Sequence, residues 1–378
     1  MRACRWVVAV GLTVAGALPA WAQRPPETHP TSESRNVVLS YDRSSNHGDE
    51  VLWGERTPIA YSPDDSVDYS KLHFTCRSST DAATGKCPTR DNAQTGAGHS
   101  EIPLRFRERR SGLASEVAVN GWIERIHTAR NCFGTWEGTR RPVSTSLHST
   151  CSGVLPDGTG AYLAIPASEL QRLVAGRWDA ELVLDLRGET DGAPLATYTF
   201  TFDLTITDYA NASIYFPLYD QITPLVNLNI DYNPIGPPPT VGGKATLDMC
   251  LYDGLGSQVA YMEVTIDDGA RAAPGRPDGM YSVWHGAGGN TESDHLDYDI
   301  DLDYGGRPLR MRNGRMQVLP GIDTAQLRMV VLPGMSYPVY CVPTPLTLRT
   351  PRVPASTKAA GYYQGELSIK VVLPPSSP

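Results

Sequence analysis

The sequence lacks the local motifs that many enzyme families carry. It has no Gly-x-Ser-x-Gly, no His-Glu-x-x-His, no phosphate-binding loop and no dinucleotide fingerprint. Its 8 histidines are scattered, and none lies in a motif with an obvious nucleophile. This favours a protein that is not an enzyme. Two alternatives stay open: a Ser-His-Asp triad assembled in space, and a secreted carbohydrate-active enzyme with two carboxylates across a cleft.

Cys-x-x-Cys and His-x-x-x-His pairs are absent as well, which argues against a structural zinc site. The chain is acidic. Its formal net charge of −8 becomes −10 when Arg2 and Arg5 are removed with the leader described below. An acidic chain argues against non-specific binding to nucleic acid. We therefore expect no metal, no cofactor and no nucleic-acid partner.

Long apolar runs are rare, and the one present lies at the N-terminus. Residues 6–18 follow Arg2 and Arg5 and precede an Ala-x-Ala site at 20–22. This pattern is typical of a signal peptide, and the run is too short to span a bilayer. We predict a signal peptide over residues 1–22 and a soluble, exported mature chain that begins at Gln23.

Of the 7 cysteines, Cys4 lies in the predicted leader, which leaves six. An even number in an exported chain favours disulfides. Six cysteines allow many connectivities, and we favour the one that joins neighbours in the sequence. The expected disulfides are Cys76–Cys87, Cys132–Cys151 and Cys250–Cys341.

Turn residues are abundant, with 35 glycines and 31 prolines, and they separate short segments that have a period of two. Such alternation predicts β-strands, and many short strands with frequent turns favour β-sandwiches. The segments are 102–107, 180–186, 196–206, 212–219 and 226–230. One segment resembles a helix, in which Ser168 is expected to cap ELQRLV and Gly176 to end it.

A mature chain of about 350 residues suits two domains. The strand patterns at 196–206 and 212–219 are separated by a turn-rich pause at 207–211. We place the junction in this pause. The first domain then covers residues 23–207, the second covers residues 208–378, and both are expected to be all-β.

The last strand pattern lies close to the C-terminus. Its apolar residues share one parity and its polar residues share the other, which predicts a half-buried strand. The apolar residues are Leu367, Ile369, Val371 and Leu373, and the polar residues are Glu366, Ser368 and Lys370. Because no later segment could pair with its far edge, this strand is expected to keep one edge free.

An acidic segment at 295–306 carries an aspartate at every second position. The acids are Asp297, Asp299, Asp301 and Asp303. Oxygen-rich clusters can hold calcium, but residues on one face of a strand lie about 7 Å apart. We favour a strand with an acidic outer face over a metal site.

A basic segment, LRFRERR, is the counterpart of the acidic one. Arg105 and Arg107 alternate with apolar residues, and Arg109 and Arg110 follow. Arginines in a row could bind carboxylates or sulfates of an acidic glycan through bidentate hydrogen bonds. The alternative is an ordinary solvated strand face.

Several longer strings occur in order from about Leu72 to the C-terminus. They are LHFTCRSSTDAATGKCPTRD, the pair Cys132 and Cys151, AIPASELQRLVAGRWDAELVLDL, LDMCLYDG and GYYQGELSIKVVL. Together they resemble the CfaE/CblD family of pilus-tip minor subunits, which belong to the alternate chaperone/usher pathway of Gram-negative bacteria. Residues 23–68 resemble the family weakly.

The resemblance implies an N-terminal adhesin domain and a C-terminal pilin domain, both immunoglobulin-like β-sandwiches, joined by a very short linker. It also implies that the second domain is an incomplete sandwich without its last strand. A periplasmic chaperone fills the gap first, and the N-terminal extension of a major pilin subunit replaces it at the outer-membrane usher. The protein would then reach the cell surface at the pilus tip, where it initiates fibre assembly.

In such an incomplete sandwich the gap is an apolar groove between the two sheets. The tail strand should form one wall and the first strand of the second domain the other. The expected groove residues are Ile214, Phe216, Leu218, Leu367, Ile369, Val371 and Leu373.

The resemblance also implies adhesion to a host cell-surface glycan or glycoprotein through arginines of the first domain. Lys71 stands where the family has an arginine, and Arg187 lies in a run that is less basic here than in the family. Lysine lacks the planar fork of arginine. The candidate receptor-binding residues are Lys71, Arg187, Arg105, Arg107 and Arg110. A purely structural initiator without a receptor is the alternative.

Overall fold

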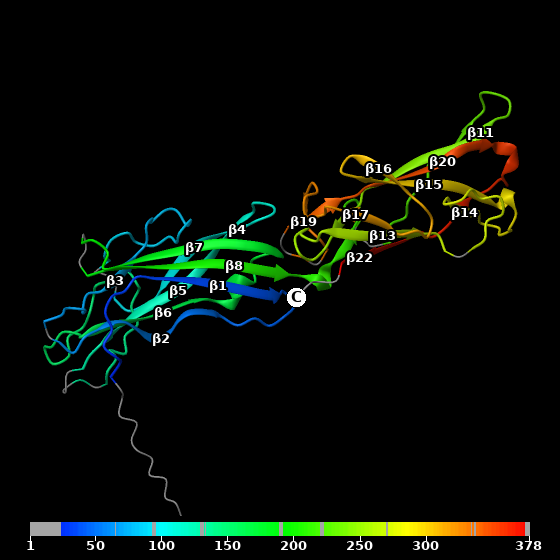
Figure 1. Cartoon of the computed structure of the whole chain (residues 1–378). Helices are drawn as coiled ribbons and strands as arrows, with labels where there is room; N and C mark the ends of the chain where they lie inside the picture. The colour runs from blue at the N-terminus through cyan, green and yellow to red at the C-terminus, as the bar shows by residue number, and fades with distance from the viewer. Residues whose placement is uncertain are drawn as a thin grey trace, which may run out of the picture.

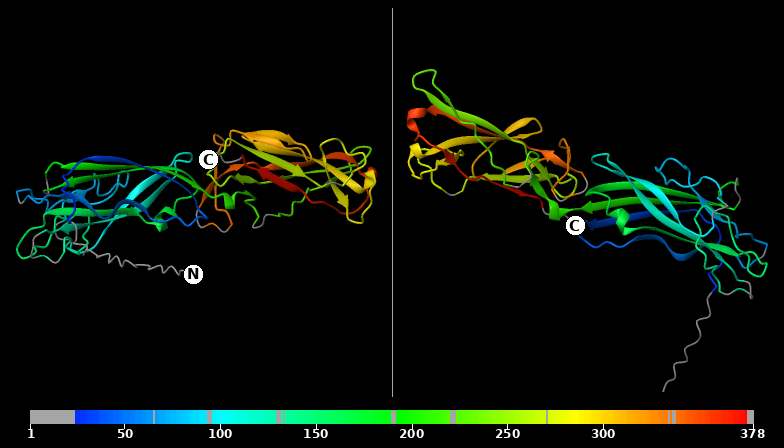
Figure 2. Two further views of the ribbon diagram at one scale, coloured as in Figure 1. Left: turned by 60° about the horizontal axis from the view of Figure 1, so that its bottom comes forward. Right: turned by 180° about the vertical axis from the view of Figure 1, so that it is seen from behind.

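The computed structural model describes residues 24–374 except 65, 93–95, 129–131, 133, 189–191, 220–222, 270, 334, 336 and 337. The predicted signal peptide lies outside the described residues. Two lobes lie end to end and give an elongated molecule (Figures 1 and 2). Nearly all regular structure is β-strand, which confirms the all-β, two-domain prediction. No helix of the described part is long and apolar enough to cross a membrane.

The first domain contains eight strands and one short helix. The strands join in the order β1-β8-β7-β4-β5-β6-β2, and β3 pairs with β7. Their bounds are β1 Glu33–Asp42, β2 Glu50–Tyr61, β3 His73–Thr75, β4 Ser100–Glu108, β5 Ala114–Ile126, β6 Gly158–Ile165, β7 Gly176–Arg187 and β8 Ala196–Thr207.

Alternation explains why these segments form strands around one core. In β8 every second residue from Ala196 to Ile206 is buried, and the residues between them are half-buried or exposed. β4 follows the same rule, with Ile102, Leu104 and Phe106 fully buried. A period of two places one set of side chains in the core and the other at the surface.

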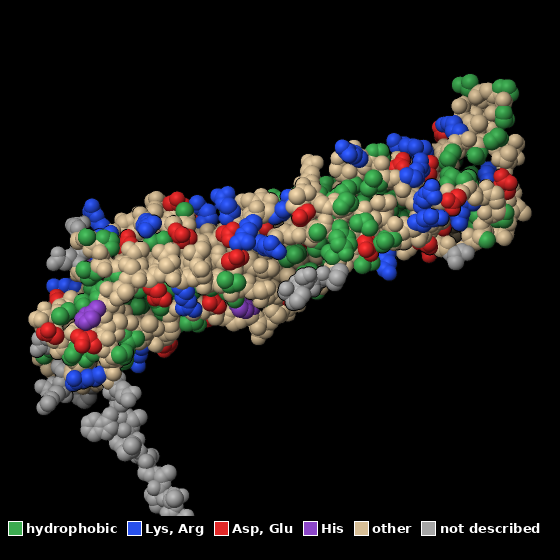
Figure 3. Space-filling model, viewed as in Figure 1, with side chains coloured by type: hydrophobic (Ala, Val, Ile, Leu, Met, Phe, Trp, Pro, Cys, Tyr) green, Lys and Arg blue, Asp and Glu red, His purple; other side chains and the backbone are tan. Residues whose placement is uncertain are grey.

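The second domain has three sheets. Their orders are β10-β11-β20-β15-β14-β21 with β16 beside β15, β18-β19-β12-β9, and β17-β13-β22. The bounds are β9 Ser213–Tyr215, β10 Asp231–Asn233, β11 Thr240–Leu247, β12 Cys250–Tyr252, β13 Tyr261–Asp267, β14 Tyr281–His285, β15 His295–Tyr304, β16 Arg307–Met311, β17 Gln317–Pro320, β18 Arg328–Val330, β19 Val339–Pro343, β20 Leu346–Pro354, β21 Tyr363–Gln364 and β22 Ser368–Val372. On the face drawn in Figure 3, hydrophobic side chains gather more on this domain than on the first.

Three disulfides are present and confirm the predicted pairing of neighbours. Cys76–Cys87 and Cys132–Cys151 close loops in the first domain, with sequence separations of 11 and 19. Cys250–Cys341 joins β12 to β19 in the second domain across a separation of 91 residues.

Two local predictions were wrong. The helix α1 covers only Ala167–Leu170, and Pro166 rather than Ser168 takes the N-cap position, without a side-chain hydrogen bond. Gly176 has a φ of +152° and opens β7 instead of closing a helix. The helix is short because the chain turns directly from it into a long strand that the core requires.

The segment 226–230 is not a strand, although it was predicted to be one. Val226 and Leu228 are half-buried and their neighbours are exposed, so the side chains still alternate. The backbone forms no ladder because this segment borders the open groove described below.

The two domains touch through polar and apolar contacts. Nη2 of Arg110 donates to the carbonyls of Ile322 (3.3 Å) and Ala325 (2.5 Å). The amide of Gln258 donates to buried Glu108 over 3.0 Å. The core of the first domain continues into the second through residues that include Tyr252, Val330 and Cys341.

Candidate functional site: an open groove in the second domain

The groove is bordered on one side by β22. This strand pairs with β13 on one edge, and it is the last strand of its sheet. Its apolar residues are half-buried and pack against the core of the second domain; they are Leu367, Ile369, Val371 and Leu373. Glu366, Ser368 and Lys370 are exposed. The predicted parity is therefore observed, but the inward side chains are only partly covered.

The opposite border is formed by β9 and by residues 223–228. β9 pairs with β12 through Ser213, Ile214 and Tyr215, and it is also the last strand of its sheet. Among the residues that the structure describes, no strand pairs with the free edge of either β9 or β22. Two sheet edges with unpaired backbone N–H and C=O groups therefore face one elongated hollow.

The hollow between these borders has a volume of about 720 Å³. Its lining includes Ile214 and Phe216 from one side and Leu367 and Ile369 from the other. Val371 and Leu373 contact the same core beside it. Leu218 is 76% exposed and does not line the hollow. The assignment of these residues to a donor-strand groove stays a prediction.

The floor of the groove was not predicted from the sequence. It consists of side chains from four separate strands, namely Leu247 of β11, Val283 of β14, Tyr298 of β15 and Leu348 of β20. Each of these strands alternates in sequence, as in LTLRT at 346–350. Alternation shows that a residue faces inward, but only the sheet order shows which inward residues meet beneath the groove.

The five candidate receptor-binding cations lie in three different places. Lys71 is exposed and precedes β3, whose His73 lies opposite Arg187 in the β3–β7 pairing. Both therefore lie at the end of the first domain that is remote from the junction. Arg107 is opposite Asp179, eight residues earlier in β7, which corresponds to roughly 25 Å along the strand.

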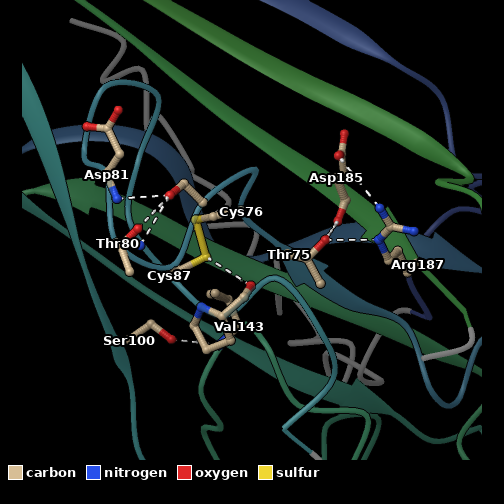
Figure 4. The surroundings of a disulfide bond; sticks show 11 residues. Thr75, Cys76, Thr80, Asp81, Cys87, Ser100, Val143, Asp185 and Arg187 are labelled. Carbon is tan, nitrogen blue, oxygen red and sulfur yellow. Dashed lines mark hydrogen bonds and ion pairs between the residues drawn. A yellow bond between two sulfur atoms is a disulfide. The ribbon is translucent and has the colours of Figure 1, made fainter. Parts of the chain in front are cut away.

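Arg187 is engaged within the protein (Figure 4). Its Nε donates to Oγ1 of Thr75 over 3.0 Å, its Nη1 donates to the carbonyl of Gly192, and its Nη2 lies 3.9 Å from Asp185. The side chain remains 21% exposed. The guanidinium is therefore held in place with one side open to solvent.

The other three arginines have different surroundings. Arg105 pairs with Asp81 of the Cys76–Cys87 loop over 2.8 Å, and Arg107 is exposed. Arg110 contacts carbonyls of the second domain at the junction. The basic segment LRFRERR therefore does not form one binding row.

A buried arginine, which no sequence pattern indicated, supports the remote end of the first domain. Arg125 is fully buried and points into the core from β5. It donates to the carbonyls of Leu72, Thr145 and Leu147 and to Oγ1 of Thr159, at distances from 2.6 to 3.2 Å. Burial lowers the pKa of Arg125 to about 9, which leaves it ionised at neutral pH.

The loops tied by Arg125 flank buried His73. Nδ1 of His73 lies 2.9 Å from the carbonyl of Lys71, and its Nε2 has no hydrogen-bond partner in the described part of the chain. Burial lowers the pKa of His73, so the imidazole is neutral at neutral pH. These contacts fix the backbone that carries Lys71.

The acidic segment forms β15, as predicted, with Tyr298, Ile300 and Leu302 facing the core. Its acids are partly covered by cations from the neighbouring strands. Arg310 lies 2.6 Å from Asp299 and 3.2 Å from Asp301, and Arg349 lies 3.7 Å from Asp301. Within the described residues, no group of three or more His, Cys, Asp or Glu side chains could hold a metal ion.

Comparison with known proteins identifies the class of this two-domain chain. The family models describe the two domains of CfaE, a CFA/I fimbrial subunit. The first-domain model matches residues 18–209, and the second-domain model matches residues 212–375. The chain belongs to this CfaE family of fimbrial tip subunits, which confirms the resemblance.

Individual relatives agree with the family. The CFA/I fimbrial protein CfaE of Escherichia coli is 30% identical over 322 residues, which are 82% of this chain and 81% of the relative. The crystal structure of CfaE, the adhesive subunit of CFA/I fimbria of enterotoxigenic Escherichia coli, superposes with a TM-score of 0.70 at 25% identity. The match covers 93% of this chain and 95% of that one.

A further solved structure holds the relative with a second protein. It is a chaperone-tip adhesin complex described as vital for synergistic activation of CFA/I fimbriae biogenesis. Its TM-score is 0.63 at 25% identity, over 93% of this chain and 99% of that one. These relatives are described as fimbrial subunits and not as enzymes.

Proposed function

We propose that the protein is a fimbrial tip adhesin that accepts a donor strand in its second domain and binds host cell-surface glycans through its first. It is not an enzyme in this proposal, and it passes through the periplasm to the tip of a surface fimbrium. Its partners are a periplasmic chaperone, an outer-membrane usher, a major pilin subunit and a host glycan or glycoprotein.

The open groove is the observation that carries this proposal. A strand inserted between β9 and β22 would pair with two free edges and place alternate side chains in the 720 Å³ hollow. The groove is apolar, so the inserted segment should alternate apolar and polar residues. The relatives' chaperone-bound structure supports a chaperone as the first occupant.

The position of the first domain explains why the chain would sit at a fibre end. Donor strands come from a free N-terminal extension. Here the start of the second domain continues directly from β8 through residues 208–212. The second domain can therefore accept a strand, but its own N-terminal side is occupied by the first domain.

Co-expression tests strand acceptance. The full chain is expected to purify in good yield with its matching periplasmic chaperone and to aggregate without it, because the groove then exposes apolar surface. A stable monomer obtained without chaperone or donor peptide would show that the groove needs no strand.

For adhesion, the favoured contact is the remote end of the first domain, where Lys71 and Arg187 lie close together. An exposed ammonium beside a fixed guanidinium suits a carboxylate or sulfate of an acidic glycan. Many fimbriae on one cell would raise the avidity above the affinity of one site.

A glycan array probed with the chaperone-bound full chain tests adhesion. Binding should concentrate on acidic glycans and be lost in Lys71→Glu, whereas Arg107→Glu should bind like the unaltered protein. Equal losses in both variants would place the site elsewhere on the first domain. Silence across acidic and neutral glycans would leave the structural initiator as the function.

A further inference from the structure

The hairpin formed by β10 and β11 projects from the second domain with an apolar tip. Its loop covers residues 234–239, between Asn233 and Thr240 of the paired strands. Ile235 is 86% exposed and Tyr232 is 60% exposed. Figures 1 and 2 show the hairpin standing clear of the domain body, and Figure 3 shows hydrophobic side chains at its tip.

The hairpin is held in shape by contacts at its base and tip. Asp231 accepts two hydrogen bonds from Nη2 of Arg352, at 2.7 and 2.8 Å. The N–H of Ile235 donates to Oδ1 of Asn233 over 2.9 Å. The carbonyl of Pro239 accepts from the N–H of Ala355 over 2.8 Å. With four prolines between residues 234 and 239, the tip would lose little conformational entropy on binding.

The location of the hairpin relates it to the groove. Residues 223–228 line the groove, and β10 begins three residues later at Asp231. The groove extends from Ser213 near the junction to Val283 and Gly365. The hairpin lies at the end of the molecule opposite the first domain (Figure 1).

A donor subunit can place its folded body only where the molecule leaves room. The first domain occupies the junction end of the second domain. The body of the subunit whose strand fills the groove must therefore lie near the opposite end, which is where the hairpin projects. A rigid apolar knob at that position would otherwise expose an isoleucine and a tyrosine to water without benefit.

We infer that the tip of this hairpin, Tyr232 with residues 234–239, docks against the folded body of the donor subunit, separately from the strand in the groove. The inference rests on the proposed strand acceptance. The partner surface should be a shallow apolar or aromatic-lined hollow, because such surfaces bind proline-rich segments. Strand and hairpin together would form a two-point contact that fixes the angle between the two subunits.

The test compares two probes on the full chain released from its chaperone complex. One probe is a synthetic peptide of the major pilin's N-terminal extension, and the other is the whole major pilin delivered from its own chaperone complex. The double variant Tyr232→Ser/Ile235→Asp should bind the peptide like the unaltered chain. It should form a complex with the whole pilin that dissociates at least tenfold faster. Val38→Asp, at a 76% exposed apolar position of the first domain, is the matched control and should change neither result.

Each outcome is decisive. Equal dissociation of the whole pilin from the variant and the control would overturn the inference. A variant that loses its chaperone while holding the pilin normally would assign the hairpin to the chaperone and also overturn it. Failure of the unaltered chain to bind the peptide would instead reject the proposed strand acceptance.

Discussion

At the scale of single residues, Arg125 shows how the first domain supports its remote end. All its hydrogen-bond acceptors are neutral: three backbone carbonyls and one hydroxyl. They belong to β6, the 142–149 segment and the chain before β3. Its guanidinium therefore replaces a sheet ladder where these segments meet.

Arg125→Met should destabilise the first domain by roughly 3–5 kcal/mol, because buried carbonyls would lose their donors. Urea unfolding followed by tryptophan fluorescence measures this, since Trp53, Trp122, Trp136 and Trp178 all lie in the first domain. Arg172→Met, at a side chain that is 51% exposed, should stay within about 0.5 kcal/mol. Equal midpoints for both variants would contradict the supporting role of Arg125.

His73 makes the first domain sensitive to acid. Burial lowers the pKa of His73 in the folded chain, whereas the unfolded chain binds a proton near the ordinary value of about 6.5. The unfolded state then holds more protons, so stability falls as pH drops below about 6.5. Burial lowers the pKa of His127 in the same direction.

The expected result is a Tm at pH 5 clearly below that at pH 7.5, with a smaller difference in His73→Gln. Scanning calorimetry at both pH values measures it. His99→Gln, at a side chain that is 57% exposed, should keep the full difference. An unchanged difference in His73→Gln would assign the acid sensitivity to other groups.

At the scale of elements, β22 separates its two faces by parity. Ile369 faces the groove and Lys370 faces solvent. Ile369→Asp should abolish capture of the chaperone or a donor peptide, because a carboxylate would be buried without a partner. Lys370→Asp is the matched control and should retain capture.

Co-purification with the chaperone and peptide binding by fluorescence anisotropy measure this effect. The first domain should remain folded in Ile369→Asp, as judged by its tryptophan emission. Normal capture by Ile369→Asp would mean that β22 is not a wall of the binding groove.

Much of this element level could be predicted from the sequence. The parity of β22, the inward face of β15 and the pairing of the cysteines all depend on local spacing, and all three are observed. The segment 226–230 could not be judged in this way. Its alternation is real, but a strand also needs a neighbour to pair with, and the neighbouring position is the open groove.

The cations show the same limit at the candidate site. Arg109 and Arg110 are adjacent in sequence, yet Arg109 pairs with Asp179 and Asp203 of its own domain and Arg110 reaches into the second. Arg125 lies between Glu124 and Ile126 and has no sequence feature that marks it as buried. Sheet order and domain contact decide these roles, and neither is encoded in local spacing.

At the scale of the whole molecule, the two domains form a continuous rod because the junction is closed by specific contacts. The N–H of Asp208 donates to the carbonyl of Gly254 over 2.6 Å. Buried Glu108 receives the amide of Gln258 over 3.0 Å. Apolar side chains from both domains share one core. Tension on a glycan-bound first domain would therefore pass through this junction into the strand-filled groove.

Arg110→Ala should loosen the junction, because it removes both hydrogen bonds from β4's end to the carbonyls of Ile322 and Ala325. Limited proteolysis of the chaperone-bound chain should then cleave faster near residues 209–211, which connect the domains. Arg109→Ala is the matched control, since it changes a neighbouring arginine whose ion pairs stay within the first domain. Scattering at small angles should give a larger radius of gyration for Arg110→Ala alone. If both variants were cleaved at the rate of the unaltered chain, the apolar contact by itself would be sufficient to hold the rod together.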